Sequence, residues 1–368
     1  MTDASLLPFS AALEEYERQA AALFEGLESG EQAAKWRFKW EHPRFRGKTV
    51  DDVRATTLNL DDARLVIAHV HAFEDWPHLE KFAETVRADG EVTRFETAVD
   101  AVVSGDAVTL RSMLRENPEL VRARSSRRHH ATLLHYIAAN GVEGGRQKTP
   151  PNAVEIARIL LDAGAEADAL ADMYDNKCTT MSMLVSSAHP SQAGLQGALA
   201  ETLLDYGAEL EGPGSNWQSS VMTALVFGYP DTAETLIKRG ASLANIGAAA
   251  GLGHVEDVAR LLPSADAKAR HAALALAAQL GRIDVVRLLL DAGEDPNRYN
   301  PDGYHSHATP LHQAIWGKHE DVVHLLVERG ARLDIKDTVY QGTPLGWAIY
   351  GERTEIADYL RSNGAPRE

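Results

Sequence analysis

Histidine and cysteine supply the side chains whose types and spacing could support metal binding or covalent catalysis. A zinc ion would need three or four ligands within about 2.0–2.3 Å. The one cysteine, Cys178, follows Lys177, but a nucleophilic thiolate also needs a general base and an electropositive setting. Cys178 is therefore not expected to be catalytic. The two groups of histidines that could serve zinc are His129, His130 and His135, and His305, His307 and His312.

Arginine and histidine are concentrated between Arg122 and His130, which is the strongest local charge of one sign in the chain. Guanidinium groups bind carboxylates and phosphates through paired hydrogen bonds, so this segment could bind an acidic or phosphorylated partner. It could equally be an exposed turn whose cations balance neighbouring acids. Both interpretations are open at this point.

Residues 35–48 combine six basic side chains with four aromatic ones. One interpretation is a platform for an anion or a single strand, because aromatic rings stack on bases and cations neutralise phosphate. The other is that Trp36, Trp40 and Phe45 anchor the N-terminal region while the cations form a solvated face. The second interpretation is favoured because the net charge of −16 repels polyanions.

A repeated pattern of leucine and glycine indicates the elements that would position these side chains. Each glycine follows a leucine by four residues, and alanine follows the glycine in five of the six copies. An apolar stripe of this kind predicts a helix with one buried face, and glycine is suited to the left-handed residue that ends it. The pairs are Leu160 and Gly164, Leu203 and Gly207, Leu236 and Gly240, Leu289 and Gly293, Leu326 and Gly330, and Leu360 and Gly364.

Two of these helices are preceded by Thr309-Pro310-Leu311-His312 and Thr343-Pro344-Leu345. Threonine caps a helix, proline fits its first turn, and leucine enters the core. With the leucine–glycine pattern, these motifs resemble the ankyrin repeat over residues 95–368. The resemblance implies an all-α solenoid of about eight helix pairs with short hairpin turns. The units are residues 95–127, 128–170, 171–210, 211–244, 245–267, 268–300, 301–334 and 335–368.

The resemblance also implies a structural role for His135 and His312, in which each hydrogen-bonds the backbone of a neighbouring repeat. Each histidine group then loses one potential ligand, so we expect no metal site and no cofactor. Residues 1–94 contain helical patterns near 10–28, 60–68 and 75–86. We interpret this region as a helical lead-in that shields the open end of the first repeat.

Departures from the repeat period predict local irregularities. Residues 141–151 and 189–196 are insertions between the two helices of neighbouring units. The unit at residues 245–267 is too short to hold a hairpin, whereas the hairpin at 298–307 is longer than usual. The row of hairpins should therefore be interrupted near the middle of the array.

Composition limits the class of protein. The chain has 368 residues, with 53 acidic and 37 basic side chains, which argues against a nucleic-acid partner. A single cysteine fits a reducing compartment, and we see neither a secretory signal nor a membrane-spanning stretch. We expect a cytoplasmic protein.

The resemblance implies a non-catalytic module that binds a protein partner through its concave face and hairpin tips. The loops at 141–151 and 189–196 leave open a small-ligand binder or an enzyme, with Arg146, His189 and Gln192 as candidate ligand residues. A structural scaffold is the other alternative. The identity of the partner and the oligomeric state are not determined by the sequence. The candidate partner-binding residues are Arg124, Arg127, Arg128, His130, Asp172, Tyr174, Trp217, Tyr304, His305 and Tyr340.

Overall fold

The computed structural model describes residues 7–86, 90–211, 219–243 and 245–366. Contacts divide the chain into two compact units, Met1–Gly214 and Ser215–Glu368. Each unit is described by itself. The predicted division into a lead-in of residues 1–94 and an array of residues 95–368 stays a prediction.

The lead-in is helical, and helices lie where the sequence predicts them near 10–28, 60–68 and 75–86. Its core contains Tyr16, Ala20, Phe73 and Leu79, each at most 1% exposed. Thr49 and Asn59 each accept a backbone hydrogen bond at a helix N-terminus, which explains where α3 and α4 begin. The elements are α1 (Leu13–Glu28), α2 (Gln32–Glu41), η1 (Pro43–Phe45), α3 (Val50–Arg54), α4 (Leu60–Val70) and α5 (Trp76–Val86).

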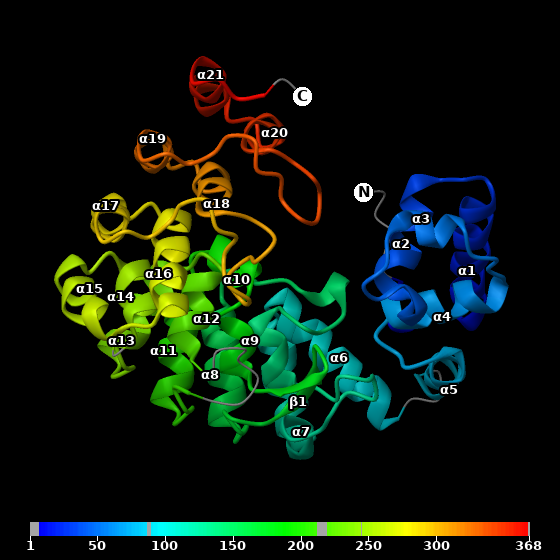
Figure 1. Cartoon of the computed structure of the whole chain (residues 1–368). Coiled ribbons are helices and arrows are strands. Elements are labelled where there is room, and N and C mark those ends of the chain that lie inside the picture. Colours follow the sequence, from blue (N-terminus) through cyan, green and yellow to red (C-terminus); the bar gives the residue numbers. More distant parts are fainter. Residues whose placement is uncertain (1–6, 87–89, 212–218, 244, 367–368) are drawn as a thin grey trace. The chain divides into compact units, whose positions relative to one another are not determined.

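Eight helix pairs follow within the described residues, which confirms the all-α repeat fold (Figure 1). The first members are α6 (Glu91–Ser104), η3 (Leu133–Ala138), α9 (Thr180–Leu184), α12 (Ser220–Val226), α14 (Ile246–Leu252), α16 (Ala267–Gln279), α18 (Pro310–Trp316) and α20 (Pro344–Tyr350). The second members are α7 (Ala107–Glu116), α8 (Ala153–Asp162), α11 (Gln196–Asp205), α13 (Pro230–Lys238), α15 (Val255–Leu261), α17 (Ile283–Asp291), α19 (Glu320–Glu328) and α21 (Thr354–Ser362).

The repeated leucine and glycine have the roles that their spacing predicts. All six leucines are 0% exposed, and all six glycines have a positive φ, between 87° and 102°. The residue after each glycine donates its N–H to the carbonyl of the leucine, at 3.0 Å from Ala165 to Leu160 and 2.9 Å from Ala331 to Leu326. This hydrogen bond, from the N–H of residue i+5 to the carbonyl of residue i, pairs a carbonyl group that the helix end would otherwise leave without a donor. One leucine thus serves both the core and the helix terminus.

The Thr-x-Leu-His motif also has the role that the resemblance implies. The hydroxyl of Thr309 lies 2.8 Å from Nδ1 of His312, and Nε2 of His312 lies 3.3 Å from the carbonyl oxygen of Gly342 in the next repeat. His135 makes the equivalent contact with the carbonyl oxygen of Cys178, at 3.4 Å. His271 contacts the carbonyl oxygen of Tyr299 at 3.1 Å without the motif.

Neighbouring pairs supply one another's hydrophobic contacts. In the unit Ser215–Glu368, the first helices α12, α14, α16, α18 and α20 pack in one row, and α15, α17 and α19 pack in a second row (Figure 1). Their shared core includes Val286, Leu289, Val323 and Leu326, each 0% exposed. In the unit Met1–Gly214, α6, η3 and α9 pack in sequence, as do α7, α8 and α11. Every pair therefore depends on the next for burial of its apolar faces.

The irregularities lie where the repeat period changes. α13 ends at Lys238 and α14 begins at Ile246, which leaves too few residues between them for a hairpin. Strands β1 (Ala171–Met173) and β2 (Asn176–Cys178) form an antiparallel hairpin, turned by Tyr174 and Asp175 at φ of 52° and 60°. The insertions contain η4 (Gly144–Arg146) and α10 (Ala188–Gln192), and two more 3₁₀ helices, η2 (Pro118–Val121) and η5 (Leu262–Ser264), follow α7 and α15. Within the described part of the chain, no helix has the length and apolarity that a membrane crossing requires.

Truncation of a repeated leucine should destabilise the fold. Leu160→Ala is expected to lower the free energy of unfolding by about 2–5 kcal/mol, because the removed atoms leave a cavity in a packed interface. Val108→Ala is the matched control, since Val108 is 82% exposed and its truncation should change stability by no more than about 0.5 kcal/mol. Urea unfolding followed by circular dichroism measures both, and similar midpoints for the two variants would contradict the assignment.

The buried histidines should make the fold sensitive to mild acid. Burial lowers the pKa of both His135 and His312 to about 4, below the ordinary value of 6.5. The unfolded chain therefore takes up protons first as pH falls, so stability is complete above about pH 6.5 and decreases from there toward pH 4. The urea midpoint should stay level above about pH 7 and decrease between about pH 6.5 and 5, before most carboxylates titrate. A midpoint that stays constant across that window would contradict this prediction.

Candidate partner-binding surfaces

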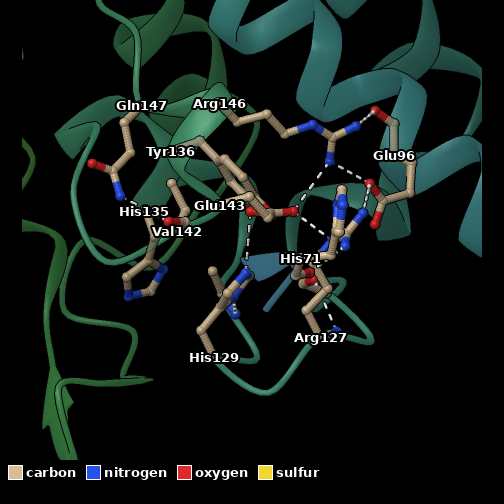
Figure 2. A network of polar contacts seen from close by, with 12 residues as sticks. His71, Glu96, Arg127, His129, His135, Tyr136, Val142, Glu143, Arg146 and Gln147 are labelled. Atoms are coloured by element: carbon tan, nitrogen blue, oxygen red, sulfur yellow. Dashed lines mark hydrogen bonds and ion pairs between the residues drawn. The ribbon is translucent and has the colours of Figure 1, made fainter. Parts of the chain in front are cut away.

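A buried network of charges lies where the lead-in meets the first two repeats (Figure 2). The carboxylate of Glu143 contacts Nε of Arg127 at 2.5 Å, Nη1 of Arg146 at 3.4 Å and Nε2 of His129 at 3.2 Å. The second carboxylate, of Glu96, pairs with both Arg127 and Arg146. These five side chains come from α6, the turn before η3, and the insertion at 141–151.

The electrostatics of this network favour its charged form. Burial alone would raise the pKa of Glu143, but the charge of Arg127 and the contact with His129 hold that pKa far below its ordinary value. Burial raises the pKa of Tyr136, whose hydroxyl donates to Glu143 at 3.3 Å. Two carboxylates face two guanidinium groups, so the buried charges balance.

Arg127 also connects the network to the lead-in. Its Nη1 donates to the carbonyl oxygen of His71 at 2.6 Å, and its guanidinium lies 4.7 Å and 4.6 Å from the ring centroids of Phe73 and Phe82. Arg146 lies 5.5 Å from the ring centroid of Phe9. The network therefore ties the lead-in, α6 and the inserted loop together. Burial and the charge of Arg127 lower the pKa of His71 to about 3, so His71 stays neutral there.

Arg127 differs from the expectation of an exposed cation at a hairpin tip. Its side chain is only 4% exposed and its guanidinium is paired with Glu96 and Glu143, so it offers no charge to a partner. Arg146 is also held in the network, with a side chain 12% exposed. His189 and Gln192, the other candidate ligand residues, are exposed on α10, and no contact brings them to Arg146. The structure does not gather these three residues into one site.

Arg124, His130 and Asp172 are brought together at the turns of the second and third repeats. Nη1 of Arg124 donates to the carbonyl oxygens of His130 and Leu170, at 3.0 Å and 2.6 Å. Nδ1 of His130 lies 3.1 Å from the carboxylate of Asp172, which also pairs with Lys177. The hydrogen bond from Lys177 lowers the pKa of Asp172. These side chains stabilise one another, which reduces what they offer to a partner.

Two other predicted residues of this unit face solvent. Tyr174 is 69% exposed, and its hydroxyl donates to Asn140 at 2.6 Å. Arg128 is exposed, and its backbone N–H donates to the carbonyl oxygen of Ala72 at 2.9 Å. Cys178 is buried, and burial raises the pKa of its thiol.

Aromatic side chains gather on the last two repeats in the unit Ser215–Glu368. The ring of His307 lies 6.3 Å from Tyr340 and 5.9 Å from Trp347, and Trp347 lies 5.9 Å from Trp316. Tyr340 lies in the last hairpin, whereas Trp316 ends α18. These contacts run from the hairpins along the first helices of two neighbouring repeats.

Several of these residues are strongly exposed for their type. Trp316 is 51% exposed, Tyr340 69% and Tyr350 83%. Val339 and Ile349 beside them are 60% and 47% exposed. We call these five residues the C-terminal aromatic surface. Several large apolar side chains exposed on neighbouring repeats are typical of an interaction site.

Only part of this surface was among the residues predicted from sequence. Tyr340 was predicted, and Tyr304 and His305 lie half-buried in the preceding hairpin, where Nε2 of His305 contacts the carbonyl oxygen of Val226 at 3.1 Å. Trp217 lies outside the described residues. Trp316 and Tyr350 were missed, although each follows the capping threonine of its repeat by seven residues. Comparison of equivalent repeat positions would have found them.

No metal centre is formed by the two histidine groups. Among the described residues, no three histidine, cysteine or carboxylate side chains converge as a metal ion would require. His135 and His312 are engaged between repeats, and His129 contacts Glu143.

Comparisons with known proteins agree with this architecture. The family model described as "Ankyrin repeats (3 copies)" matches residues 246–337. "Ankyrin repeat and KH domain-containing protein mask-1" from Caenorhabditis elegans is 30% identical over 222 residues, which are 57% of this chain and 8% of the relative. The mouse "Ankyrin repeat and SAM domain-containing protein 6" is 34% identical over 115 residues, 30% of this chain and 12% of the relative.

A third relative is "NF-kappa-B inhibitor cactus" from Drosophila melanogaster, which is 34% identical over 92 residues. This match covers 24% of the chain and 18% of the relative. The chain thus spans less than one fifth of the length of each of these three proteins.

Removal of Arg127 should be far more damaging than removal of its exposed neighbour. Arg127→Met is expected to cost about 3–5 kcal/mol of stability, because the carboxylates of Glu96 and Glu143 would keep their burial but lose a cation. Arg128→Met is the matched control and should change stability by no more than about 0.5 kcal/mol. Urea unfolding measures both variants. Equal midpoints would show that the network does not depend on Arg127.

Proposed function

The chain is an ankyrin-repeat protein, and we propose that it is a protein-interaction module whose partner contacts the C-terminal aromatic surface. The observation that carries this proposal is the exposure of Trp316, Tyr340 and Tyr350 across two adjacent repeats. Tryptophan and tyrosine are the residues most enriched among binding hot spots. Burial of these rings by a partner would remove apolar area from water without first disrupting the repeat core.

Position on the repeat supports the same proposal. The surface includes a hairpin residue, Tyr340, and residues at the ends of the first helices α18 and α20. Hairpins and first helices form the concave face of stacked repeats, where a partner can contact several units together. Cactus, by its name, is an inhibitor of NF-kappa-B. The partner of this chain would be recognised by apolar or aromatic side chains that pack against the exposed rings.

The test is affinity capture from the source cell with matched variants. Tyr340→Ala combined with Tyr350→Ala should lower the affinity for a partner recovered by the unaltered chain at least about tenfold, because two buried rings would be lost. Val108→Ala is the control, since it removes an equally exposed apolar side chain from a second helix, α7.

A photoreactive benzoyl-phenylalanine placed at residue 340, and separately at residue 108, supplies an independent measurement. The partner should be crosslinked from residue 340 and not from residue 108. Equal recovery by both sets of variants, or crosslinking from residue 108 alone, would overturn the proposed surface.

A further inference from the structure

The lead-in carries a second exposed aromatic pair, in a different unit from the C-terminal aromatic surface. Trp36 and Trp40 are one helical turn apart on α2, with ring centroids 6.1 Å apart and an interplanar angle of 14°. They are 42% and 66% exposed. Tryptophan is usually well buried in folded proteins, so two adjacent indoles in solvent require an explanation.

The expectation that Trp36 and Trp40 anchor the lead-in is not met. The inner face of α2 is formed by Ala34 and Phe38, which are 5% and 0% exposed. Phe38 packs in a small core with Phe45, Val53 and other residues of the lead-in. Phe45 alone of the three predicted anchors is buried. The indoles lie on the opposite side of the helix, where they contribute little to the core.

One cation lies against the indole pair, and further cations follow it in the sequence. Nζ of Lys39 lies 4.1 Å from the ring centroid of Trp40, and Arg44 and Lys48 are exposed in the segment that follows the helix. Among the described residues, no carboxylate lies within ion-pair distance of Lys39, Arg44 or Lys48, although the charge of Lys48 acts on Asp52. The next cation, Arg46, differs because it pairs with Asp175 at 2.9 Å. We call Trp36, Lys39, Trp40, Arg44 and Lys48 the α2 patch.

We propose that the α2 patch binds a short acidic segment of a partner protein that also carries aromatic or aliphatic side chains. Carboxylates would pair with Lys39, Arg44 and Lys48, while apolar side chains would cover the exposed faces of Trp36 and Trp40. This complementarity uses both halves of the patch, the rings and the charges. The proposal is independent of the C-terminal aromatic surface.

The number of cations favours a peptide over a polyanion. A protein that makes about 6–10 phosphate contacts depends on a matching number of cations, whereas the α2 patch offers three. A long polyanion would also extend beyond the patch and meet the rest of a chain whose net charge is −16. A short segment meets less of that negative charge, because charges more than about one Debye length away, near 8 Å at physiological salt, are largely screened.

The experiment uses the full chain and a fluorescein-labelled short peptide that alternates glutamate with phenylalanine and leucine. Fluorescence anisotropy gives the dissociation constant. Trp36→Ala combined with Trp40→Ala should weaken binding at least about tenfold, whereas Trp316→Ala should leave it unchanged. Charge reversal by Lys39→Glu combined with Arg44→Glu should abolish binding, and Lys238→Glu, at an exposed lysine of the other unit, should not.

Circular dichroism confirms that each variant is folded, and the charge-reversal pair tests the patch even if loss of both indoles disturbs α2. The same variants are titrated with an oligothymidylate and with phosphatidylcholine vesicles that contain phosphatidylserine. No peptide binding by the unaltered chain, or equal binding by the Trp36–Trp40 variant and the Trp316 control, would overturn the proposal. Binding of the oligonucleotide or the vesicles more tightly than the peptide, with loss in the same variants, would also overturn it.

Discussion

A helix pair of this length cannot bury its own apolar faces, and the rest of the structure follows from that constraint. Leu289 and Leu326 are fully buried only because a neighbouring pair lies against each side. The same leucines accept the hydrogen bonds that close their helices, so the core contact and the helix end form together. Stability is therefore distributed over interfaces between successive pairs, and the first pair needs a cover on the side where no repeat precedes it.

The lead-in contacts the first helix pair through charge as well as apolar packing. α5 packs against α6, and the guanidinium of Arg127 lies against Phe73 and Phe82 while it donates to a backbone carbonyl of the lead-in. Burial of two carboxylates and two guanidinium groups is expensive, and its net effect on stability is small when all partners are present. Its stronger effect is on specificity, because a shifted lead-in would leave Glu96 or Glu143 buried without a cation. The network thus selects one docking position.

The sequence predicted the parts of this fold that local spacing encodes. Leucine and glycine four residues apart indicate a helix end, and a capping threonine followed by proline indicates a helix start. The helix pairs and the missing hairpin between α13 and α14 could therefore be predicted. The prediction that Arg127 is exposed was wrong, because a run of basic residues is usually solvent-exposed. Its partner Glu96 lies 31 positions earlier, on helix α6, whereas Arg127 lies in the turn before η3. No local pattern shows which member of the run turns inward.

The same limit applies to α2. Four aromatic residues in fourteen positions could not all be anchors, and which of them face inward depends on the helical phase that Ala34 and Phe38 set. Trp36 and Trp40 lie on the opposite face of α2. Once the buried face of α2 is known, the prediction that Trp36 and Trp40 anchor the lead-in has to be abandoned. These rings are instead available to a partner.

The hairpin that exposes Tyr340 is held in place by a buried carboxylate. Asp337, which is 0% exposed, accepts hydrogen bonds from the backbone N–H groups of Val339, Tyr340 and Gly342 at 2.6–2.9 Å and from Nε1 of Trp347 at 2.9 Å. Burial opposes ionisation, yet these donors lower the pKa of Asp337 below its ordinary value. The hairpin is thereby fixed before any partner arrives, so less conformational entropy is lost on binding than for a flexible loop. The equivalent hairpin between the first and second repeats starts at Ser125, which supplies no such carboxylate. This difference is a physical reason for proposing the interaction surface on the last repeats.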